Sequence, residues 1–317
     1  MNRSDERFPN FDILRLLLAL EVVVDHAWSV YHATPLWRGA IPAVPAFLAI
    51  SGCLVLKSIS TSPSWGAYAL KRFLRVMPAL LLSFLICLFL FNRWVMYNSV
   101  LHWLVGGLDP ALGEKNMPLW SLAWEELAYL CLAILWVLGA YQRKVIVWAL
   151  LIAAIFLGFY GNRFASEIRI IFWLAPAFLV GNLAYLYRSQ LQKVHPSIPW
   201  IFLVLVLSAP YIPAIGFVVY KCAILFQTFA VVWVGLAGAP LIKRKFPDIS
   251  YGAYIYHYPI IMYLHEVVGI STPKTLALVL PAPLLAICLF SWYIVEKPAL
   301  RMKPKAPVMT TPPVIPT

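Results

Sequence analysis

Long apolar stretches separated by short polar ones dominate the chain. Each stretch is near the ~20 residues that a helix needs to cross the ~30 Å hydrocarbon core of a bilayer. The pattern predicts an all-α fold, a polytopic membrane bundle of about ten transmembrane helices. The predicted spans are residues 11–32, 40–58, 77–96, 118–140, 145–161, 168–187, 198–213, 215–239, 249–269 and 275–296.

Composition supports a membrane protein over a soluble one. Of the 317 residues, 62% are hydrophobic and 12% are charged, and the mean hydropathy is +0.81. Soluble domains carry about 25% charged residues. A net charge of +12 would suggest nucleic acid as the partner of a soluble protein, but here the basic residues fall in short loops between apolar runs. The expected partner is therefore the lipid bilayer, and no nucleic acid is expected.

The distribution of Lys and Arg predicts the orientation. With the amino terminus in the cytoplasm, 18 of the 25 Lys and Arg residues fall on the cytoplasmic side, where membrane proteins are enriched in them. We therefore expect a multi-pass protein of the cytoplasmic (inner) membrane with both termini in the cytoplasm. Residues 1–303 form the expected membrane domain, and residues 304–317 are a proline-rich tail that we expect to be disordered.

Two ionisable residues share one face of the first predicted span. Arg15 and His26 are eleven positions apart, which at 100° per residue returns to nearly the same face about 16 Å further along the helix. Ionisable groups inside a bilayer helix cost roughly 2.5–3.5 kcal/mol each, so they are candidates for function. The alternative is that both only line an interior filled with protein.

A second polar face opens the fourth predicted span. Ser121, Glu125 and Tyr129 are spaced four residues apart and therefore share a face. We expect Glu125 at a depth close to that of His26, where a carboxylate can fix the tautomer of the imidazole and raise its basicity. The alternative is a glutamate pair that only contacts lipid headgroups. For Glu126, this alternative and a functional role are equally good interpretations.

The segment before the third predicted span presents two arginines. Arg72 and Arg75 are three positions apart and point the same way, and two forked guanidinium groups suit phosphate oxygens. The alternative is an ordinary cytoplasmic anchor, which composition alone favours. Ser51 and Gly52 lie in the middle of the second span, where small residues permit close helix packing or the passage of a thin ligand arm.

The remaining polar residues give weaker signals. His257 enters the ninth span and suits either a ligand contact or an interfacial aromatic belt. The five cysteines all lie inside apolar segments, without metal-ligand spacing. No metal site is predicted, and no nucleotide-binding or zinc-protease motif is present.

Taken together, these residues resemble the signature of the acyltransferase 3 family, integral membrane enzymes that acylate sugar hydroxyls. Each element is weak alone, but the elements follow one another in the family's order along most of the chain. Leu48 stands where the family has a second Phe, and Pro45 stands where many members carry an acidic residue. The similar elements are Phe11-Asp12-x-Leu14-Arg15 with His26, Phe47-Leu48-Ala49-Ile50-Ser51-Gly52, Lys71-Arg72-x-x-Arg75-x-x-Pro78, Trp120-Ser121-Leu122-x-x-Glu125 with Tyr129, Ser250-Tyr251 with His257-x-Pro259, and Glu296-Lys297-Pro298.

The resemblance implies roles for the site residues. His26 would be the essential base or the residue that accepts the acyl group, and Glu125 would support it as the second catalytic residue. Arg72 and Arg75 would bind the coenzyme A end of an acyl-CoA donor. This donor is a substrate, and no permanently bound cofactor is expected. The predicted donor-binding residues are Arg15, Ser51, Arg72 and Arg75.

The expected reaction moves an acyl group, acetyl by family frequency, across the bilayer to a carbohydrate acceptor. The phosphates of coenzyme A stay at the cytoplasmic arginines, the pantetheine arm passes between the first three spans, and the thioester reaches His26 near a glycan hydroxyl on the outer side. The hydroxyl attacks the thioester directly, or the acyl group first rests on His26. A rival interpretation is a proton-coupled exporter with His26, Glu125 and Arg15 as a relay, although the sequence shows no paired halves of the kind many transporters have.

Overall fold

Helices form the regular structure of the described part of the chain. The computed structural model describes residues 8–32, 43–91, 116–160, 166–208, 213–241 and 246–304. No strand occurs within these ranges, and the predicted all-α fold is confirmed. Of the tail expected over residues 304–317, all but Pro304 lies outside the described residues.

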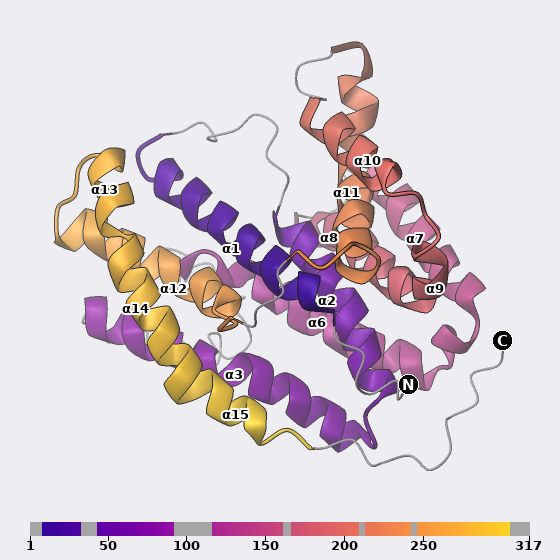
Figure 1. Cartoon of the computed structure of the whole chain (residues 1–317), viewed down its shortest axis with the longest axis horizontal. Coiled ribbons are helices and arrows are strands. Elements are labelled where there is room, and N and C mark those ends of the chain that lie inside the picture. Colours follow the sequence, from indigo (N-terminus) through magenta and orange to yellow (C-terminus); the bar gives the residue numbers. More distant parts are fainter. Residues whose placement is uncertain are drawn as a thin grey trace.

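Figure 1 shows the arrangement of the described helices, two of which continue into π-helical turns, η7 and η8. In chain order they are α1 (Pro9–Ser29), α2 (Ala43–Ser60), α3 (Trp65–Phe91), α6 (Leu119–Val137), η4 (Ala140–Gln142), α7 (Lys144–Phe159), α8 (Ser166–Leu186), α9 (Arg188–Leu191), α10 (Ser197–Ser208), α11 (Pro213–Leu236), α12 (Ser250–Met262), η7 (Tyr263–Val267), α13 (Pro273–Val279), α14 (Pro281–Phe290), η8 (Ser291–Glu296) and α15 (Lys297–Arg301).

Each of the ten predicted segments contains a helix, but the number of membrane spans stays a prediction. The third segment differs most from expectation, because α3 begins at Trp65 and not at residue 77. Its basic residues therefore lie inside the helix and not in the loop before it. Among the described residues, five helical stretches are long and apolar enough to cross a membrane, namely Ala43–Ser60, Trp65–Phe91, Leu119–Val137, Ile168–Leu186 and Pro273–Arg301.

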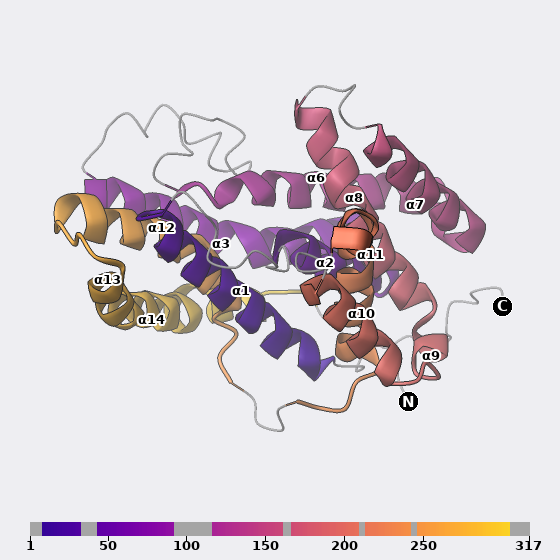
Figure 2. The same cartoon turned by 90° about the horizontal axis from the view of Figure 1, so that it is seen from above.

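Helix α2 occupies the centre of the molecule, between α1 and α6 (Figure 2). It packs closely against α8 because both helices carry glycine where they meet. A Cβ on Gly52 would collide with the carbonyl of Phe178, and a Cβ on Gly181 would collide with the carbonyl of Ala49. Small residues let helix backbones approach closely in membranes. The packing interpretation of Gly52 is confirmed, and Ser51, one position away, turns to a different side of α2.

The first turn of α1 is attached to the end of α11. The side-chain amide of Asn10 donates to the carbonyl of Val234 at 2.7 Å and accepts from the backbone N–H of Leu241 at 2.9 Å. The ring of Phe11 fills the space that Gly235 leaves free of a side chain. This attachment fixes the rotation of α1 about its axis, and its polar face turns to α12.

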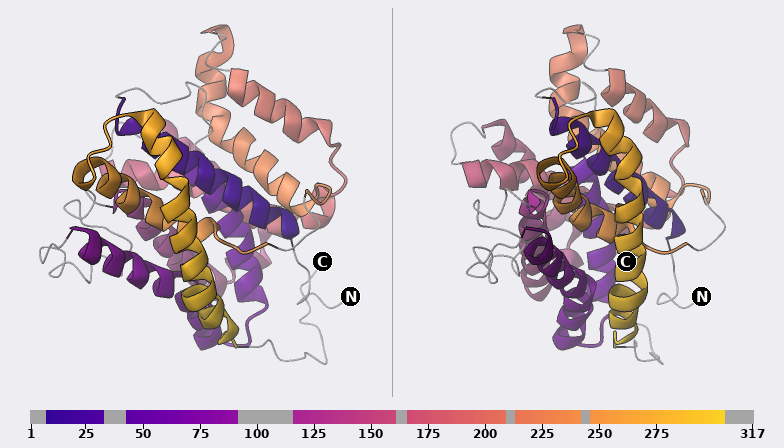
Figure 3. Two further views of the ribbon diagram at one scale, coloured as in Figure 1. Left: turned by 60° about the vertical axis from the view of Figure 1, so that its left-hand side comes forward. Right: turned by 90° about the vertical axis from the view of Figure 1, so that its left-hand side faces the viewer.

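Helix α12 packs against both α1 and α3. The hydroxyl of Tyr251 donates to the carbonyl of Val76 at 3.1 Å, and that of Tyr256 donates to the carbonyl of Ala79 at 3.2 Å. The last helix, α15, packs beside α3, so that the end of the described chain lies near the beginning of α3 (Figure 3). The basic residues of α1, α3 and the chain end therefore gather at one end of the bundle.

Candidate active site

The histidine of α1 faces a second histidine. His26 Nδ1 lies 2.8 Å from Nε2 of His257 on α12, and the two rings are nearly parallel, with centroids 5.1 Å apart and planes 5° apart. The ring of Tyr258 meets His26 edge-on at 5.5 Å. His257 is 0% exposed, so its interpretation as an interfacial belt residue is wrong. Within the described ranges, no group of three or more His, Cys, Asp or Glu side chains could hold a metal ion.

Glu125 does not meet His26, and the prediction that it does is wrong. Its Oε1 accepts hydrogen bonds from the hydroxyl of Ser51 on α2 and from the hydroxyl of Tyr129, the latter at 2.6 Å. Helix α6 packs against α2, so its polar face turns to α2 and not to the histidines. The predicted common face of α6 is correct, because Ser121, Glu125 and Tyr129 line the same pocket.

Two arginines share one buried carboxylate. Arg15 Nη2 lies 3.2 Å and Arg75 Nη2 lies 3.0 Å from the same oxygen of Asp248, in the segment before α12. Ser250 donates to the other oxygen at 2.7 Å. Burial opposes the ionisation of Asp248, but Arg15 and Arg75 outweigh burial and hold the pKa of this carboxyl well below its usual range. Asp248 therefore stays charged and holds both guanidinium groups in place.

Arg72 has no carboxylate partner in the part of the chain that the structure describes. Its Nη2 donates to the hydroxyl of Ser58 at 3.3 Å, and its guanidinium lies over the ring of Tyr129 at 5.7 Å. Its buried Nε makes no hydrogen bond there. Among the described residues, the neighbouring Lys71 donates only to the hydroxyl of Ser62, at 3.0 Å. Unused donors on positively charged groups suit an anionic ligand.

A further cation reaches this place from the end of the chain. Lys303 follows α15, and burial together with the nearby charges of Arg75 and Arg72 lowers its pKa to about 7. Repulsion of this kind marks a place where positive charge accumulates. Lys303 is one of the 18 basic residues expected on the cytoplasmic side, and its position beside the arginines was not predicted. The group, called the cationic cluster below, consists of Arg15, Lys71, Arg72, Arg75 and Lys303.

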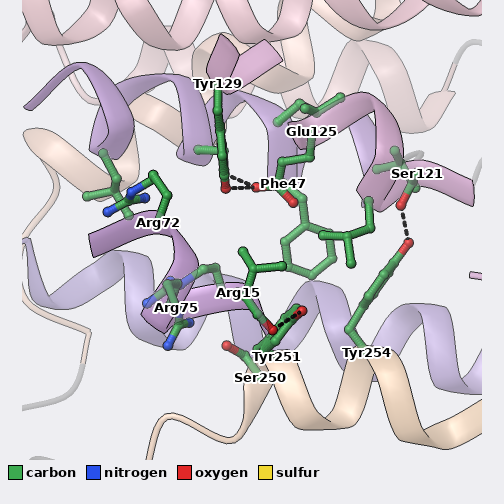
Figure 4. Close-up of a pocket in the computed structure, with 16 residues that line it drawn as sticks. Arg15, Phe47, Arg72, Arg75, Ser121, Glu125, Tyr129, Ser250, Tyr251 and Tyr254 are labelled. Atoms are coloured by element: carbon green, nitrogen blue, oxygen red, sulfur yellow. Dashed lines mark hydrogen bonds between the residues drawn. The ribbon is translucent and has the colours of Figure 1, made fainter. Parts of the chain in front are cut away.

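Three residues of this cluster, Arg15, Arg72 and Arg75, line a pocket whose empty volume is about 820 Å³ with its open mouth included. Figure 4 shows Arg72 and Arg75 at one end and the bonded pair of Ser121 and Tyr254 at the other, with Glu125 between them. The two hydroxyl groups of that pair are 2.5 Å apart. The pocket thus joins the predicted donor residues of α1, α2 and α3 to the polar face of α6.

Tyr254 separates the pocket from the histidine pair. Its ring meets the ring of Phe47 edge-on at 5.4 Å on the pocket side, and its centroid lies 6.3 Å from that of His257 on the other side. Neither His26 nor His257 lines the pocket. Tyr254 therefore lines the pocket and also neighbours the buried histidine.

A family profile described as an acyltransferase domain, that of acyltransferase 3, matches residues 8–296. The chain belongs to the acyltransferase 3 family. The match runs from the start of α1 to the end of η8 and includes the pocket, the histidine pair and all of the cationic cluster except Lys303. This acyltransferase is a multi-pass membrane enzyme. Its membership of the family favours the predicted acyltransferase over the proton-coupled exporter.

Two relatives align with nearly the whole chain. The nodulation protein 10 of Rhizobium leguminosarum bv. viciae is 27% identical over 93% of this chain and 94% of its own length. The O-acetyl transferase of Shigella phage Sf6 is 26% identical over 93% of this chain and 97% of its own length. No solved structure matches the chain significantly.

Proposed function

We propose that this acyltransferase moves the acetyl group of acetyl-CoA to a hydroxyl of a carbohydrate. The phage relative is named an O-acetyl transferase, and the family supplies acyl transfer. One observation carries the proposal: the pocket has an excess of positive charge at one end, and Tyr254 in its wall also neighbours the histidine pair. Such a pocket suits a long donor that is charged at one end and reactive at the other.

The cationic cluster binds the phosphates of the donor. Coenzyme A carries its phosphate groups at the end opposite to the thioester, and forked guanidinium groups pair well with phosphate oxygens. Arg15 and Arg75 are held by Asp248, which keeps their remaining N–H groups in a fixed geometry. Arg72 has no competing carboxylate within the described ranges, so it gives the strongest contact.

The middle of the pocket holds the pantetheine arm. Phe47 and neighbouring apolar residues of α2 form one wall, and Glu125 and Ser51 supply polar groups. Glu125 Oε1 is already used by Ser51 and Tyr129, but its Oε2 makes no hydrogen bond within the described residues. It can accept from an amide N–H of the arm. This mixture of apolar walls with a few fixed polar groups is typical of small-molecule sites.

His26 performs the proton transfer. It takes the proton of the acceptor hydroxyl, and the hydroxyl oxygen attacks the carbonyl carbon of the thioester. The carbon–sulfur bond then breaks, and coenzyme A leaves as a thiolate that takes up a proton. In a second route, the imidazole attacks the thioester carbonyl, the carbon–sulfur bond breaks, and coenzyme A leaves as a thiolate that takes up a proton. The acceptor hydroxyl then attacks the acyl carbon of acyl-His26, the acyl–nitrogen bond breaks, and the released imidazole takes up the hydroxyl proton. Retention of radioactive acetyl on wild-type protein without acceptor, and its loss in His26→Ala, separates the second route from the first.

The cationic cluster lies on the cytoplasmic side in this proposal. Phosphates cannot enter hydrocarbon, and the bias of basic residues places the same end of the bundle in the cytoplasm. The acceptor glycan then meets His26 from the outer side. Reporter fusions after residues 115 and 245 test this orientation, with the first expected outside and the second inside. Both reporters on one side would contradict it.

Activity can be tested on purified protein in nanodiscs. Acetyl-CoA is added together with glycans extracted from cells that lack this protein. Free coenzyme A thiol is then measured, and the masses of the glycans are determined by mass spectrometry. Wild type should release coenzyme A and add the mass of acetyl groups to a glycan, whereas His26→Ala should do neither. Equal release by both proteins, or a glycan of unchanged mass with wild type, would overturn the proposal.

A further inference from the structure

His257 has a hydrogen-bond partner at each ring nitrogen. Its Nδ1 lies 2.9 Å from the backbone carbonyl oxygen of Ala253, one turn earlier in α12, and its Nε2 lies 2.8 Å from Nδ1 of His26. A carbonyl oxygen only accepts, so Nδ1 of His257 carries a hydrogen. A neutral imidazole has one N–H, and Nε2 of His257 is therefore an acceptor.

The surroundings of His257 require its neutral form. The side chain is 0% exposed, and its ring neighbours are His26, Tyr254 and Tyr258. No carboxylate pairs with it in the described part of the chain. A charged imidazolium without a counter-ion is costly in such a place, which excludes the form that would donate from both nitrogens.

We infer that His257 is a positioning residue that fixes the tautomer of His26, so that Nε2 of His26 is the nitrogen that reacts. Because Nε2 of His257 accepts, Nδ1 of His26 donates, and the lone pair of neutral His26 lies on its Nε2. This nitrogen is not the one that contacts His257. The inference rests on the proposed function of His26 and adds the atom that takes the proton or the acyl group.

The same hydrogen bond persists through the reaction. When Nε2 of His26 takes the proton of the acceptor hydroxyl, the ring becomes an imidazolium whose Nδ1–H still donates to His257. Hydrogen bonds from a charged donor are stronger than those from a neutral one, so the contact stabilises the transition state more than the ground state. An aspartate does this for the histidine of serine proteases. A neutral imidazole does it here without a second charge inside the membrane.

Two amide substitutions at position 257 distinguish this positioning role from a role in packing alone. By bond count from Cα, the side-chain amide of glutamine reaches the position of Nε2, and that of asparagine reaches the position of Nδ1. His257→Gln therefore keeps an acceptor for His26, whereas His257→Asn keeps only the bond to Ala253. We expect kcat of His257→Gln to stay within about tenfold of wild type, and kcat of His257→Asn to fall about 100-fold, part of the 10²–10⁴ that a general base supplies. KM for acetyl-CoA should not change in either variant, because His257 lies outside the donor pocket.

The ranking of the two amides decides the inference. If His257→Asn equals or exceeds His257→Gln, His257 serves only its own helix and the positioning role is refuted. If both variants bind acetyl-CoA normally but are as inactive as His26→Ala, His257 takes part in the chemistry itself, which also overturns a positioning role.

A readout without catalysis keeps the two proposals apart. In wild-type protein labelled with ¹⁵N-histidine, assigned by comparison with His26→Ala, the NMR signals should show His26 with hydrogen on Nδ1 and none on Nε2 when the ring is neutral. The opposite tautomer contradicts the inference whatever the activity. The predicted tautomer in a protein that transfers no acetyl group would leave the histidine pairing intact and refute only the proposed function.

Discussion

The cationic cluster and the histidine pair lie on the two sides of Tyr254 and are built on opposite principles. In the cluster, two of the five basic residues share the carboxylate of Asp248, and Arg72 has unused donors among the described residues. In the pair, one hydrogen bond joins the two imidazole rings, and His257 is completely buried. Excess charge suits the capture of an anion, whereas a neutral, directed hydrogen bond suits proton transfer in a dry place.

This difference predicts that substitutions in the two regions have opposite kinetic signatures. Loss of a contact that binds the donor equally in ground state and transition state raises KM and leaves kcat unchanged. Loss of a group that acts only in the chemical step lowers kcat without a change in donor affinity.

The largest effect is expected at the histidine pair. His26→Ala should lower kcat by at least the 10²–10⁴ that a general base contributes, and acetyl-CoA should still protect the protein against heat. His265→Ala is the matched control, because His265 hydrogen-bonds the carbonyl of Ile270 and is not part of the pair. Initial rates of acetyl transfer measure the effect. Near-normal turnover of the His26 variant would remove the proposed base.

The arginines should show the reverse signature. Arg72→Ala should raise KM for acetyl-CoA about 10- to 100-fold, since a hydrogen bond to a charged group is worth about 1.5–3 kcal/mol, with little change in kcat. Arg72→Lys should recover only part of the loss, because it keeps the charge without the fork. Arg143→Ala, an exposed cation before α7, serves as the control. If Arg72→Ala keeps the wild-type KM, Arg72 is a membrane anchor only.

The two glutamates of α6 give a smaller contrast. Glu125 lines the pocket, whereas Glu126 does not, and Glu126 Oε1 is buried without a hydrogen bond among the described residues. Glu125→Gln keeps the shape but turns an acceptor towards the pantetheine arm into a donor. Its kcat/KM should fall about tenfold, and that of Glu126→Gln should change less. Equal losses, or the opposite ranking, would mean that α6 is rotated relative to this structure.

The smallest effect is a pH dependence of donor binding. Lys303, whose pKa is lowered to about 7 by burial and neighbouring cations, is charged below that pH and neutral above it. A bound phosphate favours the charged form, so KM for acetyl-CoA should rise about three- to tenfold between roughly pH 6.5 and 8.5. In Lys303→Met the rise should disappear, and in Lys303→Arg KM should stay low throughout. An unchanged rise in Lys303→Met would assign the pH dependence to another group.

Features set by local spacing could be predicted from the sequence, and contacts between helices could not. The shared face of Ser121, Glu125 and Tyr129 follows from helix periodicity alone, and the structure has it. Which helix that face meets depends on the rotation of α6, which is set by packing against α2. The predicted partner of Glu125 was therefore wrong.

The same limit explains why the contacts of Asp248 and His257 were not predicted. Asp248 lies in the segment before α12, and only the fold brings it between Arg15 and Arg75. His257 carried a motif signal, but its partner lies 231 positions away in the sequence. The start of α3 was placed too late because its first turns carry basic residues, which interrupt the apolar run but not the helix.

Donor binding and acetyl transfer are thus assigned to two separate regions, the cationic cluster and the histidine pair. Calorimetric titration of acetyl-CoA into His26→Ala and Arg72→Ala, each in nanodiscs, measures this separation. We expect wild-type affinity for His26→Ala, and about 10- to 100-fold weaker binding for Arg72→Ala. An affinity loss in His26→Ala as large as that in Arg72→Ala would contradict the separation of the two regions.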